Sequence, residues 1–95
     1  MMRYDVQLHT PLGKRSGKLE VKINGSYASG VLHILNRSEP FEGEIDSSGQ
    51  CHFAGKLVTL TRTIPYQAEG QITEDAVELY LTGNTGCYRL TGVPV

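Results

Sequence analysis

Apolar and polar residues alternate along almost the whole 95-residue chain, and no apolar pattern with the 3.6-residue period of a helix persists for two turns. Such alternation is typical of strands that bury one face and expose the other. The chain is therefore predicted to be one all-β domain, residues 1–95, built as an antiparallel up-and-down meander. The short strands are expected at residues 3–9, 17–23, 26–35, 41–46, 50–59, 64–73, 77–82 and 87–93.

The strongest turn signal is Asn24-Gly25. Both central residues of a type I′ turn need a positive φ angle, which Asn and Gly tolerate best. This turn predicts a hairpin in which Ile23 lies opposite Ser26. Residues 36–40 are expected to form the next turn.

A three-residue loop at 47–49, with Gly in its last position, predicts a hairpin with a bulge. Its register places Gly43 opposite Phe53 and Phe41 opposite Gly55. Each aromatic ring would then cover the bare backbone of a glycine on the neighbouring strand. A slip of one residue would destroy this match, so the register is well specified.

Small residues recur on the predicted inner face of the later strands. They are Ala28, Gly30, Gly43, Gly55, Ala68, Gly70 and Gly92. Glycine weakens a strand, so this many glycines indicate tight coiling or close approach of backbones. We therefore predict a strongly curved sheet that forms a small barrel or half barrel.

A glycine-rich, eight-strand antiparallel meander resembles the lipocalin and calycin group, and small bacterial barrel domains of that kind in particular. The resemblance lies in the pattern of strands and glycines over most of the chain. It implies a barrel with an apolar interior that would admit a small ligand. No functional residue is carried over from it.

Charge and composition limit the kinds of partner that the chain is expected to bind. Nine basic and ten acidic residues give a formal charge of −1, and no basic stripe of the kind that nucleic acid requires is present. No signal-peptide pattern and no membrane-spanning apolar stretch is seen, so we expect a cytoplasmic protein. Cys51 falls on the inner face and Cys87 on the outer face, so we expect two free thiols.

Two histidines and two glutamates form the sharpest chemical constellation. Extending the predicted pairing puts His33 opposite Glu42, and the next hairpin puts His52 opposite Glu44, all on the outer face. Two imidazoles and two carboxylates are a plausible zinc or iron ligand set. The alternative, which we favour, is an exposed sheet face on which opposite charges pair, so we predict no cofactor.

Five aromatic side chains are expected on the inner face: Tyr4, Phe41, Phe53, Tyr66 and Tyr88. They would line a ligand cavity, with the tyrosine hydroxyls as polar contacts. The alternative is core filling, because an eight-strand barrel is just wide enough to be packed by its own side chains.

The longest polar connection is expected at residues 10–17, and it carries the best basic cluster, Lys14-Arg15. We predict that it is the functional loop. No catalytic set is evident, because His52 points to the opposite face from Cys51 and no Ser–His–acid arrangement is expected.

Five apolar residues fall on the predicted outer face: Val31, Leu35, Val58, Leu60 and Tyr80. Together with strand edges left free by incomplete closure, they predict a homo-oligomer. Three functions stay open. A non-enzymatic binding module for a small apolar ligand comes first, a structural or interaction domain acting as a homo-oligomer second, and a metal protein or enzyme third.

Overall fold

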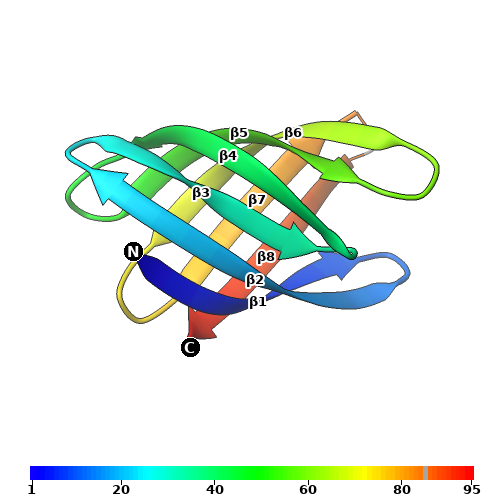
Figure 1. The fold of residues 1–95 in the computed structure, drawn as a ribbon, viewed down its shortest axis with the longest axis horizontal. Helices are drawn as coiled ribbons and strands as arrows, with labels where there is room; N and C mark the ends of the chain where they lie inside the picture. Colours follow the sequence, from blue (N-terminus) through cyan, green and yellow to red (C-terminus); the bar gives the residue numbers. More distant parts are fainter. Residues whose placement is uncertain (85) are drawn as a thin grey trace.

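The computed structural model describes residues 1–84 and 86–95, which form a closed barrel of antiparallel strands (Figure 1). Each strand pairs with the next along the chain, and the last pairs with the first. The predicted all-β, up-and-down fold is confirmed, and the barrel is closed. The strands are β1 (Met2–Thr10), β2 (Gly13–Asn24), β3 (Tyr27–Ile34), β4 (Arg37–Ile45), β5 (Gln50–Val58), β6 (Thr63–Ile72), β7 (Val77–Gly83) and β8 (Gly86–Pro94). The described residues include no helix able to cross a membrane.

The alternation in the sequence is the alternation between core and solvent. On β1, Tyr4, Val6 and Leu8 are buried while Asp5 and Gln7 are exposed. The same pattern on the other strands fills the barrel with apolar side chains, and no charged or polar side chain is buried among the described residues. The inner faces of all the strands therefore share one hydrophobic core.

Glycines allow neighbouring strands to approach closely. A Cβ atom at Gly30 would lie 1.8 Å from the carbonyl oxygen of Glu20, and one at Gly43 would lie 1.9 Å from that of His52. No side chain fits at such distances, so these strands coil more tightly than any other residue would permit. This agrees with the curvature that the inner-face glycines predict.

The β4–β5 hairpin has the predicted register. Gly43 lies opposite Phe53, and Glu44 lies opposite His52. Gly55 lies just beyond this ladder and next to Phe41, since a Cβ atom at Gly55 would be 3.2 Å from that of Phe41.

Both cysteines are free thiols, with Cys51 buried and Cys87 exposed, as predicted. Burial raises the pKa of Cys51 to about 11. The thiol is therefore protonated at neutral pH and behaves as a small apolar filler of the core.

The predicted β2–β3 register is wrong by two residues. Gly25 and Ser26 are the central residues of the turn, Asn24 pairs with Tyr27, and Ile23 lies opposite Ala28. Gly25 has a φ of 65°, the pattern of a type II′ turn, which needs a positive φ only at its first central residue. Because the shift is even, the predicted inner face of β3 is still correct.

The predicted turn at 36–40 is also wrong. Leu35 and Asn36 are the central residues, with φ angles of 55° and 61°, and β4 already begins at Arg37. Both angles are positive, as a type I′ turn requires. Pro40 is tolerated inside β4 because the β4–β5 ladder begins only at Glu42, so its missing N–H costs that ladder no hydrogen bond.

The loop predicted at residues 10–17 is mostly strand. Pro11 and Leu12 make the turn, and β2 begins at Gly13, so Lys14 and Arg15 pair with β1. The β1–β2 hairpin therefore projects farther than the sequence indicated. It reaches beyond the short β3–β4 hairpin at the same end of the barrel (Figure 1).

Candidate binding site at the basic end of the barrel

A notch of about 790 Å³ lies in the surface beside the β3–β4 turn. It is lined by residues 15–16 of β2, residues 33–38 around the turn, and residues 59–61 of the β5–β6 connection. The notch exists because the β1–β2 and β5–β6 hairpins extend past the β3–β4 turn on either side (Figure 1). Below, "the notch" means this cavity.

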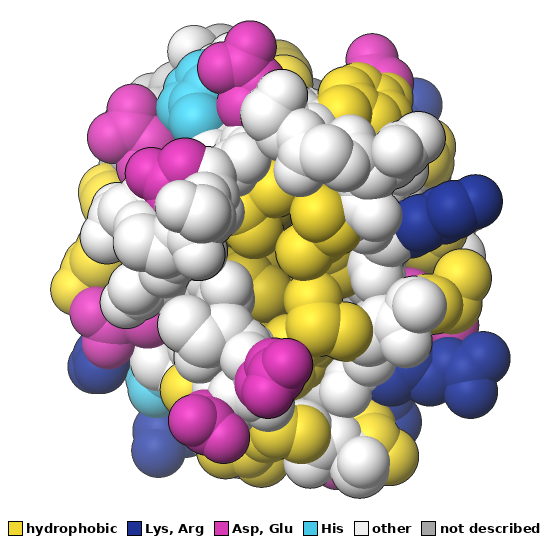
Figure 2. Space-filling view, turned by 90° about the vertical axis from the view of Figure 1, so that its left-hand side faces the viewer, with side chains coloured by type: hydrophobic (Ala, Val, Ile, Leu, Met, Phe, Trp, Pro, Cys, Tyr) yellow, Lys and Arg dark blue, Asp and Glu magenta, His cyan; other side chains and the backbone are white. Residues whose placement is uncertain are grey.

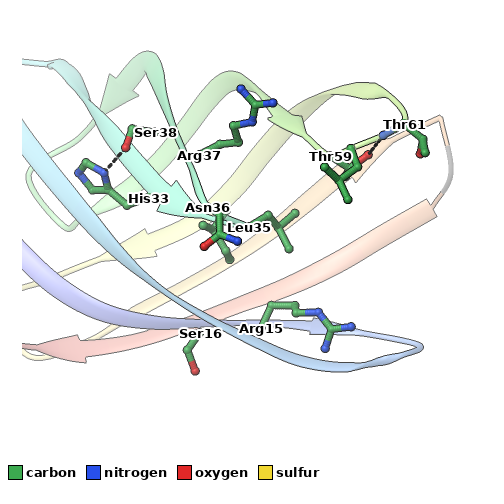
Figure 3. Close-up of a pocket in the computed structure, with 11 residues that line it drawn as sticks. Arg15, Ser16, His33, Leu35, Asn36, Arg37, Ser38, Thr59 and Thr61 are labelled. Atoms are coloured by element: carbon green, nitrogen blue, oxygen red, sulfur yellow. Dashed lines mark hydrogen bonds between the residues drawn. The ribbon is translucent and has the colours of Figure 1, made fainter.

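Two arginines flank the notch. Figure 3 shows Arg15 and Arg37 on opposite sides of it, with Leu35 and Asn36 on the floor between them. No ion pair between described residues involves either guanidinium. Among the described residues, the Arg15 guanidinium donates a single hydrogen bond, of 3.3 Å, to the backbone carbonyl of Lys14. Both guanidinium groups are therefore available to an anion.

The surrounding charge has the same sign. Lys14 and Arg62 lie in the same two projecting hairpins, and neither forms an ion pair with a described residue. Glu39 supplies an acidic group, and its carboxylate is 3.8 Å from the ammonium of Lys56. This end of the barrel is consequently positive, although the whole chain carries a formal charge of −1.

His33 joins a relay of side chains across the outer wall at the notch. Its Nδ1 atom is 2.6 Å from the hydroxyl of Ser38, and its Nε2 atom is 2.8 Å from a carboxylate oxygen of Glu20. The hydrogen bond from His33 lowers the pKa of Glu20, and that from Arg3 adds to this effect. An ionised carboxylate can only accept, so neutral His33 carries its proton on Nε2 and accepts from Ser38 through Nδ1.

The structure brings together only part of the predicted metal set. Glu44 and His52 are paired as expected, and Glu42 lies two residues from Glu44. His33, however, lies opposite Ser38, four residues before Glu42, because the β3–β4 turn is shorter than predicted.

The outward side chains of that wall have other partners. Glu42 accepts a hydrogen bond of 2.5 Å from Tyr27, and His52 lies 3.9 Å from Glu69. The described residues include no cluster of three or more His, Cys, Asp or Glu side chains that would hold a metal ion.

The five predicted ligand-binding aromatics are core residues. Tyr4, Phe41, Phe53 and Tyr66 are buried, and Tyr88 packs against the core at its edge. The open volume inside the barrel is about 10 Å³, enough for about one water molecule. A ligand would therefore enter the interior only if core side chains moved.

Buried tyrosines complete this packing. The hydroxyl of Tyr4 donates a hydrogen bond of 2.6 Å to the carbonyl of Thr73, which ties β1 to the β6–β7 turn. Burial raises the pKa of Tyr66 to about 12. Both phenols are thus neutral at physiological pH.

Sequence reasoning found only part of the notch. The sequence predicts that Arg15 lies in the functional loop and that Arg37 lies in a turn, and it does not predict the Ser38–His33–Glu20 relay. The relay depends on the β2–β3 and β3–β4 registers, both of which differ from the predicted ones. No short motif in the chain marks either feature.

The outer apolar residues lie in different surroundings. Leu35 and Leu60 line the notch, Val31 and Val58 are half buried, and Tyr80 is exposed on β7. Closure of the barrel also leaves no free strand edge in the described sheet.

Comparison with protein-family models, with curated proteins and with solved structures finds no match to this chain.

Proposed function

We propose that this barrel is a binding module that takes a small anionic ligand in the notch. The observation that carries the proposal is a cavity flanked by two arginines that form no ion pair with a described residue. Ligand pockets commonly measure about 300–1,000 Å³, and the notch falls within that range. The lipocalin-like pattern of the strands is compatible with a binding role, with the ligand at the mouth in place of the interior.

The chemistry of the lining defines the ligand class. A guanidinium group matches the planar oxygen geometry of carboxylate, phosphate and sulfate. Leu35 and Leu60 offer apolar surface in the same cavity. We infer a ligand that carries an acidic group on a small apolar body.

The conformation of Leu35 supports a role for the floor of the notch. A leucine at φ 55° is uncommon, and the left-handed region costs a non-glycine residue about 1–2 kcal/mol. Glycine or asparagine would form this turn with less strain. Strained residues of this kind cluster at ligand sites, where the side chain serves a purpose that the turn does not need.

Titration of the protein with phenyl phosphate, followed by backbone amide NMR shifts, tests the proposal. We expect shifts centred on residues 33–38 and weaker binding of inorganic phosphate, which lacks the apolar body. Replacing both Arg15 and Arg37 by Gln should weaken binding at least about tenfold, since each hydrogen bond from a charged donor contributes on the order of 1 kcal/mol or more.

Lys22→Gln is the matched control. Lys22 is also exposed and forms no ion pair with a described residue, but it lies outside the notch, and we expect no change in affinity. Equal loss of binding in the control and in the double variant would show that net charge, and not the notch, attracts the anion.

A second candidate function rests on the hydroxyl–imidazole–carboxylate relay. We propose that Ser38 acts as a nucleophile toward anionic esters bound in the notch. Its Oγ atom would attack the acyl carbon and pass its proton to His33 Nδ1, which returns it to the departing alcohol. Water would then hydrolyse the acyl-serine. Serine hydrolases usually direct Nε2 at the serine, and here Nδ1 takes that place.

A fluorophosphonate probe, read by intact mass, tests this candidate. We expect one adduct on the wild-type protein, and none on the Ser38→Ala variant. Ser16→Ala is the control, because Ser16 also lines the notch and Figure 3 shows no hydrogen bond between Ser16 and an imidazole. An unlabelled wild-type protein, or an adduct that persists without Ser38, removes the candidate and leaves the anion-binding proposal standing.

A further inference from the structure

The end of the barrel opposite the notch is hollowed and acidic. Figure 2 shows a depression with a hydrophobic floor, with Asp and Glu side chains at its upper left and below it, and with Lys and Arg side chains along its right-hand side. Three turns surround this end, at residues 25–26, 46–49 and 73–76. They carry Asp46, Glu74 and Asp75, and this carboxylate-bearing rim with its apolar floor is called the socket below.

Strand ends supply the floor of the socket. The last inner-face pairs before the three turns are Ile23 with Ala28, Ile45 with Cys51, and Ile72 with Val77. Ile23 remains 42% exposed although it lies on the inner face, whereas the other five side chains are buried, so the floor is open to solvent at Ile23. The charges of Glu74 and Asp75 also reach the floor, because they add to burial in raising the pKa of Tyr4.

The notch end carries two projections with the opposite character. The β1–β2 turn exposes Leu12, which is 86% accessible and lies two residues before Lys14. The β5–β6 connection exposes Leu60, which is 100% accessible and lies two residues before Arg62. Each projection thus presents an exposed leucine close to a cation, and the two are called the prongs below.

We propose that copies of this chain associate head to tail, with the prongs of one copy against the socket of the next. The prongs offer apolar tips and positive charge, and the socket offers an apolar floor and a negative rim. Burying Leu12 and Leu60 would remove apolar surface from water, while Lys14 and Arg62 would face the carboxylates.

The geometry defines the kind of assembly. Prongs and socket lie at opposite ends of the longest axis, so the contact is heterologous and repeats without closing. The barrel measures 24 × 19 Å across its shorter axes, so an end-on contact lies among the small, transient interfaces. We expect weak, reversible chains that lengthen with protein concentration and shorten in high salt. The inference does not rest on the two arginines of the anion site, although Leu60 belongs both to the notch and to a prong.

Sedimentation velocity from about 10 μM to about 1 mM protein tests the proposal in a range suited to weak association. Two variants remove one partner each: a socket variant, Glu74→Lys with Asp75→Lys, and a prong variant, Leu60→Ser with Arg62→Gln. Each alone should associate at least about tenfold more weakly, a loss of about 1.4 kcal/mol. An equimolar mixture of the two variants should form dimers and nothing larger. The intact prongs of the socket variant can bind the intact socket of the prong variant, and no second intact pair remains to extend the chain.

The socket substitutions should leave the fold intact. The hydroxyl of Thr73 accepts hydrogen bonds from the backbone N–H groups of Asp75 and Ala76, so the turn does not depend on the replaced carboxylates. Glu69→Lys with Glu78→Lys makes the same charge change on the outer wall, and this control should still associate.

Two results would overturn the proposal. One is a wild-type protein that stays monomeric over the whole concentration range. The other is a dimer that survives in both the socket and the prong variants, since that would show a different, symmetric contact.

Discussion

Replacing Gly43 by alanine is expected to destabilise the barrel by about 3 kcal/mol or more, at the upper end of the usual cost of overpacking. The added Cβ atom would lie 1.9 Å from the carbonyl oxygen of His52 and 2.8 Å from the Cα atom of Phe53. Both are backbone atoms of β5, so no side chain can rotate away. β4 and β5 would have to separate where their ladder is only four pairs long, from Glu42–Ala54 to Ile45–Cys51.

Thermal and urea unfolding measure this loss. A loss of 3 kcal/mol corresponds to a fall in Tm of roughly 12–24 °C for a domain of this size. Glu44→Ala is the control, because Glu44 is the next residue on β4 and its side chain faces solvent. If the Gly43→Ala variant had the same Tm as the Glu44→Ala control, close approach of the strands would not be the reason for the inner-face glycines.

The sequence predicted which face of each strand is buried better than it predicted which residues pair across neighbouring strands. Alternation assigns each side chain to core or solvent over a single strand, and burial on β1 follows it without exception from Arg3 to Leu8. The β4–β5 register was also correct, because a short glycine loop and the match of Gly43 with Phe53 both specify it.

Both wrong registers arise at turns whose positions the local sequence does not determine. A turn can move by one residue along Asn24-Gly25-Ser26 and still place a glycine at a positive φ angle, so the local signal does not choose between the two positions. In the next hairpin, a leucine adopts the left-handed conformation, which no propensity predicts. Both errors are even shifts, so they preserved the inner face but changed every cross-strand partner.

The pairing of residues across neighbouring strands determines which side chains come together at the candidate site. The predicted metal set required His33 beside Glu42, whereas the actual turn places His33 beside Ser38 and brings Arg37 to the edge of the notch. A site built across several strands therefore depends on long-range pairing, and a single sequence carries little information about it.

The two proposals meet at the same end of the molecule. The notch lies between the prongs, so a ligand held by Arg15 and Arg37 would occupy the space that a neighbouring copy approaches. A bound anion would also reduce the positive charge that attracts the acidic rim. If both proposals hold, binding at the notch and head-to-tail association should oppose each other, as linked equilibria require.

Replacing Phe53 by alanine is expected to cost about 3–5 kcal/mol, a large share of the 5–15 kcal/mol that holds a typical domain together. Phe53 is 2% exposed, and its ring lies 4.9 Å from that of Phe41, at 57°. Both rings line the small interior void, so losing one ring enlarges an existing space in the centre of the barrel.

This variant also tests where a ligand can bind. In the wild-type protein the interior holds about 10 Å³ of open volume, so benzene should not raise its Tm. The Phe53→Ala cavity is apolar, and cavities of that kind stay dry and accept benzene-sized molecules. Benzene at about ten times its dissociation constant should stabilise the variant by about 1.4 kcal/mol. If the variant is too unstable to study, Phe53→Leu leaves a smaller cavity for the same measurement. Benzene stabilisation of the wild-type protein would instead mean that the core opens to apolar ligands, and it would return the binding site to the barrel interior.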